Sequence, residues 1–178
     1  MAAALAEAAA AGGNFRHSDR QVRLFHRGIH AGEAIAYRVA TCWAGGPQPL
    51  SGSEATQMWY AECSDPGYNF ELPQPQDGTG HFTQLVWRAS RLLGIAGATV
   101  VTSARQSLSQ ADSDSQPEAE DTDSDYPMTV TNVVVALYFP PGNVDKCFED
   151  NVLPIVADGG SGGLDDGGSD QLQATESS

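Results

Sequence analysis

Cysteine is scarce in this sequence. The 178 residues include three, Cys42, Cys63 and Cys147. An odd number cannot all pair within one chain, and no short-spaced Cys/His pattern of a structural zinc site is present. Two of the three could still form one disulfide, so the cysteine content favours neither an oxidising nor a reducing compartment.

Complete catalytic motifs are also missing. The sequence has neither the G-x-S-x-G pattern of a serine nucleophile nor the H-E-x-x-H pattern of a zinc protease. No catalytic residue is indicated, and we expect a non-enzymatic protein.

Basic residues are few, 9 Lys and Arg against 23 Asp and Glu. The imbalance is local: residues 111–125 hold seven acidic residues, residues 157–178 hold five, and neither segment holds a basic one. Without these twelve, 11 acidic residues face 9 basic ones, a net charge of about −2. The acidity therefore belongs to solvated segments, and we do not expect binding of nucleic acid through a basic surface.

Long apolar runs are absent, so we expect no membrane span. The first 13 residues, MAAALAEAAAAGG, lack the basic start of a secretory signal and contain Glu7. Alanine favours a helix here, and Gly12 and Gly13 should end it. Ala2 also excludes N-myristoylation, which requires glycine at this position.

The most informative segment is TGHFTQLVW at residues 79–87. Gly, Pro and Asp in the preceding loop break regular structure, and apolar residues then recur at helical spacing. His81 should therefore lie at the start of a short helix, where the helix dipole favours a neutral ring that can bind a metal or accept a proton. A histidine that only caps the helix is the alternative.

A second helix should begin at Ser51, because Ser51 and Glu54 can form a capping box. Ala55, Met58 and Trp59 would then face inward, and Glu62 falls on the same face. A carboxylate there either lines a cavity or reaches solvent at the helix end, because isolated burial costs several kcal/mol.

Three segments resemble strands. Residues 33–43 are β-branched and aromatic but alanine-rich enough to be helical. Residues 92–102 alternate weakly and should form a strand that Gly94 and Gly97 interrupt. Residues 130–139 are apolar in both phases. The last should be a central strand covered on both faces. Residues 103–127 are too polar to pack, so we expect a disordered insertion within a hairpin, and residues 157–178 read as a disordered tail.

Several motifs occur in an order that resembles the CAP superfamily, the cysteine-rich secretory proteins, antigen five and group-one pathogenesis-related proteins. They are His17-Ser18, Gly32-Glu33, WYAE at residues 59–62, YNF at 68–70, GHFTQLVW at 80–87 and VVVALYFPPGNV at 133–144. The resemblance spans residues 15–154 and is strongest to the disulfide-poor Golgi-associated plant pathogenesis-related branch. Ordered motifs are far more specific than any one of them.

The resemblance implies an α/β (α+β) fold, a three-layer α-β-α sandwich with a mainly antiparallel sheet, in one domain over residues 1–156. It also implies that the family's first helix is missing from this chain. The cavity residues carried over are His17, Glu33, Glu62 and His81, although 16 residues separate the first two, several more than is usual in the family. His17 and His81 would hold one weakly bound divalent metal such as Zn²⁺. His26 and His30, four apart, could also form a metal pair but read better as part of an Arg-rich loop.

Three functions follow as expectations. The first is a binding protein for a sterol or other lipid, with Tyr68, Phe70 and Leu72 as lipid-contacting candidates. The second is a metal-assisted hydrolase with Glu33 or Glu62 as general base. The third is a membrane-associated scaffold that self-associates, for instance as a homodimer. The resemblance implies an extracellular location or, alternatively, the cytoplasmic face of Golgi membranes.

Overall fold

The described residues form a three-stranded antiparallel sheet with helices on both faces. The computed structural model describes residues 1–13, 15–43, 46–103 and 127–155. The strands are β1 (Gly32–Cys42), β2 (Leu92–Ser103) and β3 (Met128–Phe139), and the sheet order is β1-β3-β2. The mixed α+β fold class is confirmed, and residues 130–139 do form the central strand.

The helices begin and end close to the predicted positions. α1 (Ala2–Gly12) ends at Gly13, which adopts a left-handed conformation with φ of 57°. α2 (Gly52–Ala61) begins with the predicted capping box between Ser51 and Glu54. The short helices α3 (Gly80–Leu85) and α5 (Phe148–Asn151) follow.

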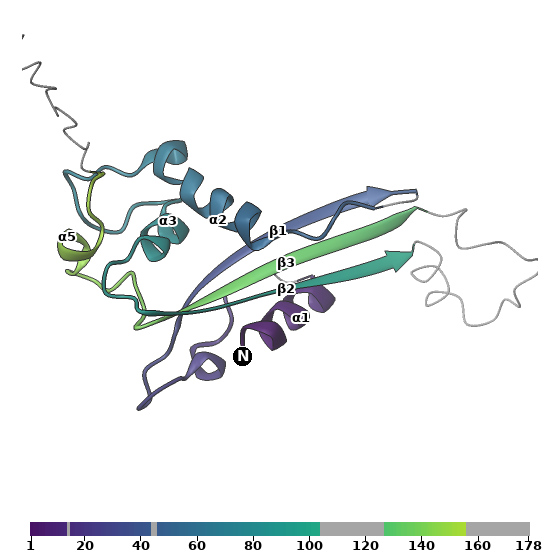
Figure 1. Ribbon diagram of the computed structural model, residues 1–178, viewed down its shortest axis with the longest axis horizontal. Helices are drawn as coiled ribbons and strands as arrows, with labels where there is room; N and C mark the ends of the chain where they lie inside the picture. The colour runs from purple at the N-terminus through teal and green to yellow at the C-terminus, as the bar shows by residue number, and fades with distance from the viewer. Residues whose placement is uncertain (14, 44–45, 104–126, 156–178) are drawn as a thin grey trace, which may run out of the picture.

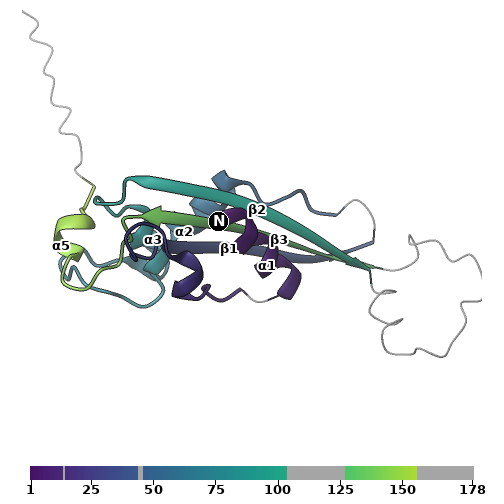
Figure 2. The same cartoon turned by 90° about the horizontal axis from the view of Figure 1, so that it is seen from below.

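The two faces of the sheet carry separate cores. Ala34, Ala36, Val134 and Ala136 pack against Ala55 and Trp59 of α2, whereas Ile35, Val133, Val135 and Leu137 pack against Ala6 and Ala10 of α1. Figure 1 shows α1 and α2 on opposite sides of the strands, and Figure 2 shows α1 in front of the sheet when the molecule is seen from below. The three layers are therefore α1, the sheet, and α2 with α3.

Two local predictions were wrong. Met58 does not face inward: it is 45% exposed, whereas Ala55 and Trp59 are buried. Gly94 and Gly97 do not interrupt β2, which pairs with β3 continuously from Leu92 to Ser103. The predicted insertion lies outside the described residues except for its ends, Ser103 and Pro127, and the predicted tail at 157–178 lies wholly outside them.

No helix of the described residues is long and apolar enough to cross a membrane.

α3 and α5 gather at the end of the sheet where β1 and β2 begin and β3 ends (Figure 1). The four predicted cavity residues lie at this same end.

Candidate functional site

Glu62 joins the end of α2 to the start of α3. It is the C-cap residue of α2, and its Oε2 accepts hydrogen bonds from the backbone N–H groups of His81 and Phe82, both at 2.9 Å. The first N–H groups of a helix have no partner within the helix, and a negative charge there is favoured by the helix dipole. Glu62 therefore acts as the cap of α3 and fixes where that helix begins.

The same carboxylate also orients the His81 ring. Oε1 of Glu62 lies 2.7 Å from Nδ1 of His81. A carboxylate can only accept a hydrogen bond, so Nδ1 carries the proton and Nε2 of the neutral ring keeps a free lone pair. The two side chains are partly exposed, which leaves the ring accessible from solvent.

Glu33 makes an equivalent contact with His17. Its Oε1 lies 2.9 Å from Nδ1 of His17 and accepts a hydrogen bond of 2.9 Å from the Ser18 backbone N–H, while Oε2 accepts one from the Ser18 hydroxyl. The Glu33 side chain is only 1% exposed, whereas that of His17 is 57% exposed. The buried carboxylate therefore holds an exposed imidazole in place.

Arg23 stabilises the part of the site that His17, Ser18 and Glu33 form. It is buried, and its guanidinium donates to the carbonyl oxygens of Ala31 at 3.1 Å and Ser18 at 3.0 Å. Burial raises the pKa of Glu33, but the hydrogen bonds from His17 and Ser18 and the charge of Arg23 outweigh it, so the pKa is lowered overall. Glu33 therefore stays ionised when buried.

The two His/Glu pairs meet in one concavity of about 200 Å³. All four predicted residues line it, together with Gly78, Gly80 and Asn143. The centroids of the His17 and His81 rings are 6.0 Å apart. The structure thus brings together four side chains that the sequence separates by up to 64 residues.

Gln84 packs beneath this site, and no sequence pattern had assigned it a role. It is buried, its side-chain oxygen accepts from the Gly142 backbone N–H at 2.9 Å, and its Nε2 donates to the Ser90 hydroxyl at 3.3 Å. A side chain at Gly32 would overlap the Gln84 amide. This contact explains why a glycine precedes Glu33.

Asn143 ties the loop after β3 to α3. It has a positive φ of 55°, its Oδ1 accepts from the Thr83 hydroxyl at 2.7 Å, and its Nδ2 donates to the Gly80 carbonyl at 2.8 Å. Asparagine tolerates this backbone conformation better than most residues. In the sequence, Asn143 follows Gly142 within the motif at residues 133–144, and no role had been assigned to it.

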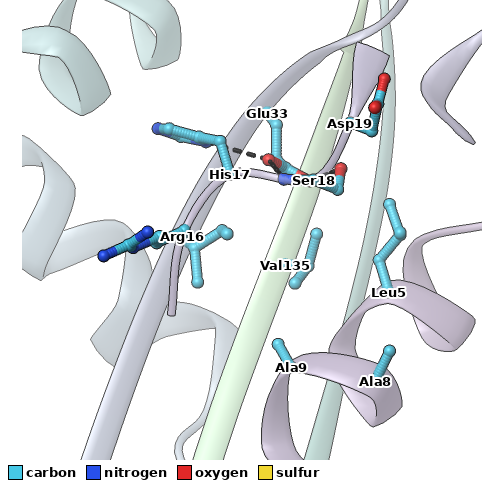
Figure 3. A pocket seen from close by; sticks show the side chains of 10 residues that line it. Leu5, Ala8, Ala9, Arg16, His17, Ser18, Asp19, Glu33 and Val135 are labelled. Atoms are coloured by element: carbon cyan, nitrogen blue, oxygen red, sulfur yellow. Dashed lines mark hydrogen bonds and ion pairs between the residues drawn. The ribbon is translucent and has the colours of Figure 1, made fainter. Parts of the chain in front are cut away.

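A second concavity, of about 240 Å³, lies on the α1 side of the same two residues, His17 and Glu33. Figure 3 shows that Leu5, Ala8 and Ala9 of α1 face Val135 across it, while His17, Ser18 and Glu33 form its polar margin. His17 and Glu33 therefore line both concavities.

The predicted lipid-contacting residues lie elsewhere. Tyr68 and Phe70 pack with Phe82 in a core cluster, which is the ordinary packing role, and Leu72 is exposed. None of the three lines either concavity described above. Their proposed contact with lipid remains a prediction.

A larger cluster of side chains that could bind a metal is not assembled within the part of the chain that the structure describes. No three His, Cys, Asp or Glu side chains there are grouped so that they could hold a metal ion. His26 is exposed, and burial together with Arg20 and Arg23 lowers the pKa of His30. His17 and His81 are therefore the imidazoles whose position would allow them to share a metal ion.

Two known proteins are similar to this chain over part of its length. It is 35% identical over 114 residues to Golgi-associated plant pathogenesis-related protein 1 of Homo sapiens. These residues make up 63% of this chain and 54% of that protein. It is 36% identical over 86 residues to Pathogenesis-related protein 1 of Arabidopsis thaliana, which covers 45% of this chain and 47% of that protein. A comparison with protein-family models finds no match.

The fold and site define an α+β protein with a shared His/Glu concavity at one end of its sheet. Together with the two similarities, they support membership of the CAP superfamily for the matched part of the chain. The chain spans about half the length of the relatives it matches.

Proposed function

We propose that the chain is a binding protein that holds one divalent cation such as Zn²⁺ through Nε2 of His17 and Nε2 of His81. The observation that carries this proposal is that each Nδ1 is already engaged by a carboxylate, at 2.9 Å and 2.7 Å. Such a carboxylate–histidine contact fixes the ring and increases the basicity of the nitrogen that binds the metal.

The separation of the rings fits one shared ion. With Zn–N bonds of about 2.0–2.1 Å, the centroids of two imidazoles on the same ion lie at most roughly 6 Å apart. The observed 6.0 Å is at this limit, so a small inward movement of the exposed His17 side chain completes the pair. Two protein ligands leave the remaining positions to water or to a ligand, and the affinity should be low.

A binding function is favoured over hydrolysis because both carboxylates already accept hydrogen bonds from neighbouring groups. Glu33 and Glu62 each accept three hydrogen bonds, and the pKa of Glu33 is lowered by those from His17 and Ser18 despite its burial. A carboxylate that is stabilised in its ionised form is a weak general base. We therefore place the two glutamates as supports of the histidines.

A lipid ligand has weaker support. An apolar concavity of about 240 Å³ lies between Phe25, the start of α1 and the neighbouring ends of β2 and β3. Ligand pockets usually measure about 300–1,000 Å³, so this one suits an acyl chain better than a sterol. The relatives' names favour neither secretion nor a Golgi location for this chain.

Titration of the full chain with Zn²⁺ or Co²⁺ in a calorimeter tests the metal proposal. We expect one ion per chain, binding that is abolished by His17→Ala or His81→Ala, and unchanged binding in the control His26→Ala. Co²⁺ should also quench Trp59, whose ring centroid is 6.4 Å from that of His81. Binding that survives both site substitutions, or that is lost only in the control, would reject the proposal.

A further inference from the structure

The outer side of β2 carries main-chain groups that the rest of the described structure does not use. β2 lies at one edge of the sheet that the described residues form (Figure 1). It pairs with β3 continuously, and no other described segment forms a main-chain hydrogen bond with residues 92–102. The N–H and C=O groups that point away from β3 can therefore pair with an extended chain.

β2 also lacks the features that normally prevent such pairing. Its 12 residues include no charged residue and no proline, and its register with β3 contains no bulge. The opposite edge, β1, differs. Phe15 stacks on Tyr37 there, with ring centroids 4.0 Å apart, and Arg38 forms an ion pair of 2.6 Å with Glu54. β2 is therefore the edge suited to binding another strand.

A pocket opens at the start of this edge. It is the apolar concavity of about 240 Å³ beside Phe25, and Leu92 and Gly94 of β2 contribute to its wall. Gly94 lies on the α1 face of the sheet, because it pairs with Leu137 of the core on that face. Nothing lies within 4 Å of a Cβ atom added at Gly94. A side chain of a strand paired with β2 can therefore cross Gly94 and enter the pocket.

The neighbouring residues of β2 define which other side chains fit. Leu93 and Ile95 lie on the α2 face and are 61% and 45% exposed, so apolar partners suit these two positions. Ala98 and Val100 lie on the other face and pack against the core that α1 covers, so the partner's side chains there must be small. In recognition by an added strand, main-chain hydrogen bonds supply affinity, and pockets for alternate side chains supply specificity.

Two arginines lie directly before β2. Arg88 and Arg91 are exposed, and neither forms an ion pair within the part of the chain that the structure describes. The Arg91 guanidinium donates to the Arg88 carbonyl oxygen at 2.9 Å, which keeps the two residues together. A chain that runs antiparallel to β2 and passes the pocket continues toward these arginines. Charge complementarity therefore favours acidic residues in that part of the partner.

We infer that β2 binds an extended segment of another protein, which adds antiparallel to the edge of the sheet. An aromatic side chain of the segment lies opposite Gly94 and enters the pocket, and the third residue after it is acidic and faces Arg91. Antiparallel pairing continues the arrangement of the three strands already present. The unused main-chain groups beside the pocket favour a peptide over an acyl chain, which has no groups to pair with them. The site is separate from the His/Glu concavity and does not depend on a metal.

A synthetic peptide titrated into the full chain in a calorimeter tests the inference. The peptide Thr-Ser-Thr-Ser-Val-Phe-Val-Thr-Glu-Glu, acetylated and amidated at its ends, places Phe opposite Gly94 and the first Glu opposite Arg91. Its two valines face Leu93 and Ile95. We expect one peptide per chain. Replacing Phe by Ala in the peptide should raise the dissociation constant about 30-fold. Replacing both Glu by Gln should raise it about threefold or more.

Variants of the chain test the same contacts from the other side. Gly94→Leu should fill the pocket without disturbing the fold and weaken binding about 30-fold. Thr41→Leu, at an exposed position on the same face of β1, is the matched control and should leave the affinity unchanged. Arg91→Glu should weaken binding of the glutamate peptide but not of the glutamine peptide. Equal melting temperatures, measured by circular dichroism, exclude misfolding as the cause of lost binding.

Several results would overturn the inference. These are the absence of saturable binding, a loss in Gly94→Leu no larger than in Thr41→Leu, and tighter binding of a peptide with the reversed sequence. Two further results would assign the edge to another occupant. A wild-type dimer that Gly94→Leu dissociates, with no peptide bound, would assign it to a second copy. Binding of decanoate that Gly94→Leu abolishes, with no peptide bound, would assign the pocket to an acyl chain.

Discussion

Glu62 accepts hydrogen bonds from both the backbone and the ring of His81, at 2.9 Å and 2.7 Å. One carboxylate thus sets the position of α3 and the orientation of the histidine at its start. Glu33 makes the parallel contact with the Ser18 backbone and the His17 ring. Local folding and the chemistry of the site depend on the same two glutamates.

Replacing Glu62 by Gln should therefore weaken both stability and metal binding. The amide retains one acceptor, but the charge-assisted bonds to α3 and the His81 ring are lost, and we expect about 1–3 kcal/mol less stability. Loss of a carboxylate behind a metal-binding histidine should weaken metal affinity about 10–100-fold. Urea unfolding and calorimetric titration measure the two effects. Glu71→Gln removes the same charge at an exposed position and should change neither.

Gly32→Ala should destabilise the protein through Gln84. The added methyl group would overlap the buried Gln84 amide, which is held by Gly142 and Ser90 and cannot move freely. Overpacking of this kind costs about 1–3 kcal/mol. Thermal unfolding should show a fall of about 2–4 °C per kcal/mol. Gly94→Ala is the matched control, because nothing lies within 4 Å of a Cβ atom added at Gly94. Equal melting temperatures of Gly32→Ala and Gly94→Ala would contradict the assigned contact.

Helical periodicity and capping preferences were sufficient to predict parts of this fold. They placed His81 in the first turn of α3 and the capping box at Ser51. They left Glu62 open between a cavity and the solvent, and it proves to be the C-cap of α2 and to line the concavity. Apolar residues in both phases predicted the central position of β3. Met58 was misplaced because only the Ala55 and Trp59 side of α2 is buried, and the width of a buried stripe depends on what packs against it.

The supports of the site could not be read from the sequence. Arg23 lies in an Arg-rich segment that resembles a solvated loop, and only the fold shows that it is buried against the carbonyls of Ala31 and Ser18. Gln84 depends on a glycine at position 32 and another at 142, contacts that exist only after the sheet forms. The resemblance to the CAP superfamily supplied His17 and Glu33, whose long separation gives no local signal.

Asn143 should combine a backbone role with a hydrogen-bonding role, and two substitutions separate them. Asn143→Gly keeps the positive φ of 55° but loses the bonds to Thr83 and Gly80, so we expect a cost of about 1–2 kcal/mol. Asn143→Ala should cost about 1 kcal/mol more, because alanine is also strained in the left-handed region. Denaturant unfolding of the two variants gives this difference. If alanine proved no worse than glycine, backbone strain would not contribute at this position.

The stability of the protein should fall in acid partly through Glu33. Hydrogen bonds from His17 and Ser18 and the charge of Arg23 lower the pKa of Glu33 below its ordinary 4.5 despite burial. The ionised form is thus favoured by folding, so its contribution is complete above about pH 4.5 and is lost as the pH falls through the lower, folded-state pKa. Unfolding free energies measured from pH 7 down to about pH 3 should show the wild type losing its advantage over Glu33→Gln.

Glu54 supplies the control for this acid dependence. Arg38 and Ser51 lower the pKa of Glu54 to about 2, so the wild type has a second acid-sensitive group. Glu54 does not contact Glu33, so the two sites should act independently. Glu54→Gln is therefore added both to the wild type and to Glu33→Gln. The difference in unfolding free energy between these two proteins should then be the same as without Glu54→Gln at each pH. A difference that stays constant with pH would show that Glu33 titrates equally in the folded and unfolded chains.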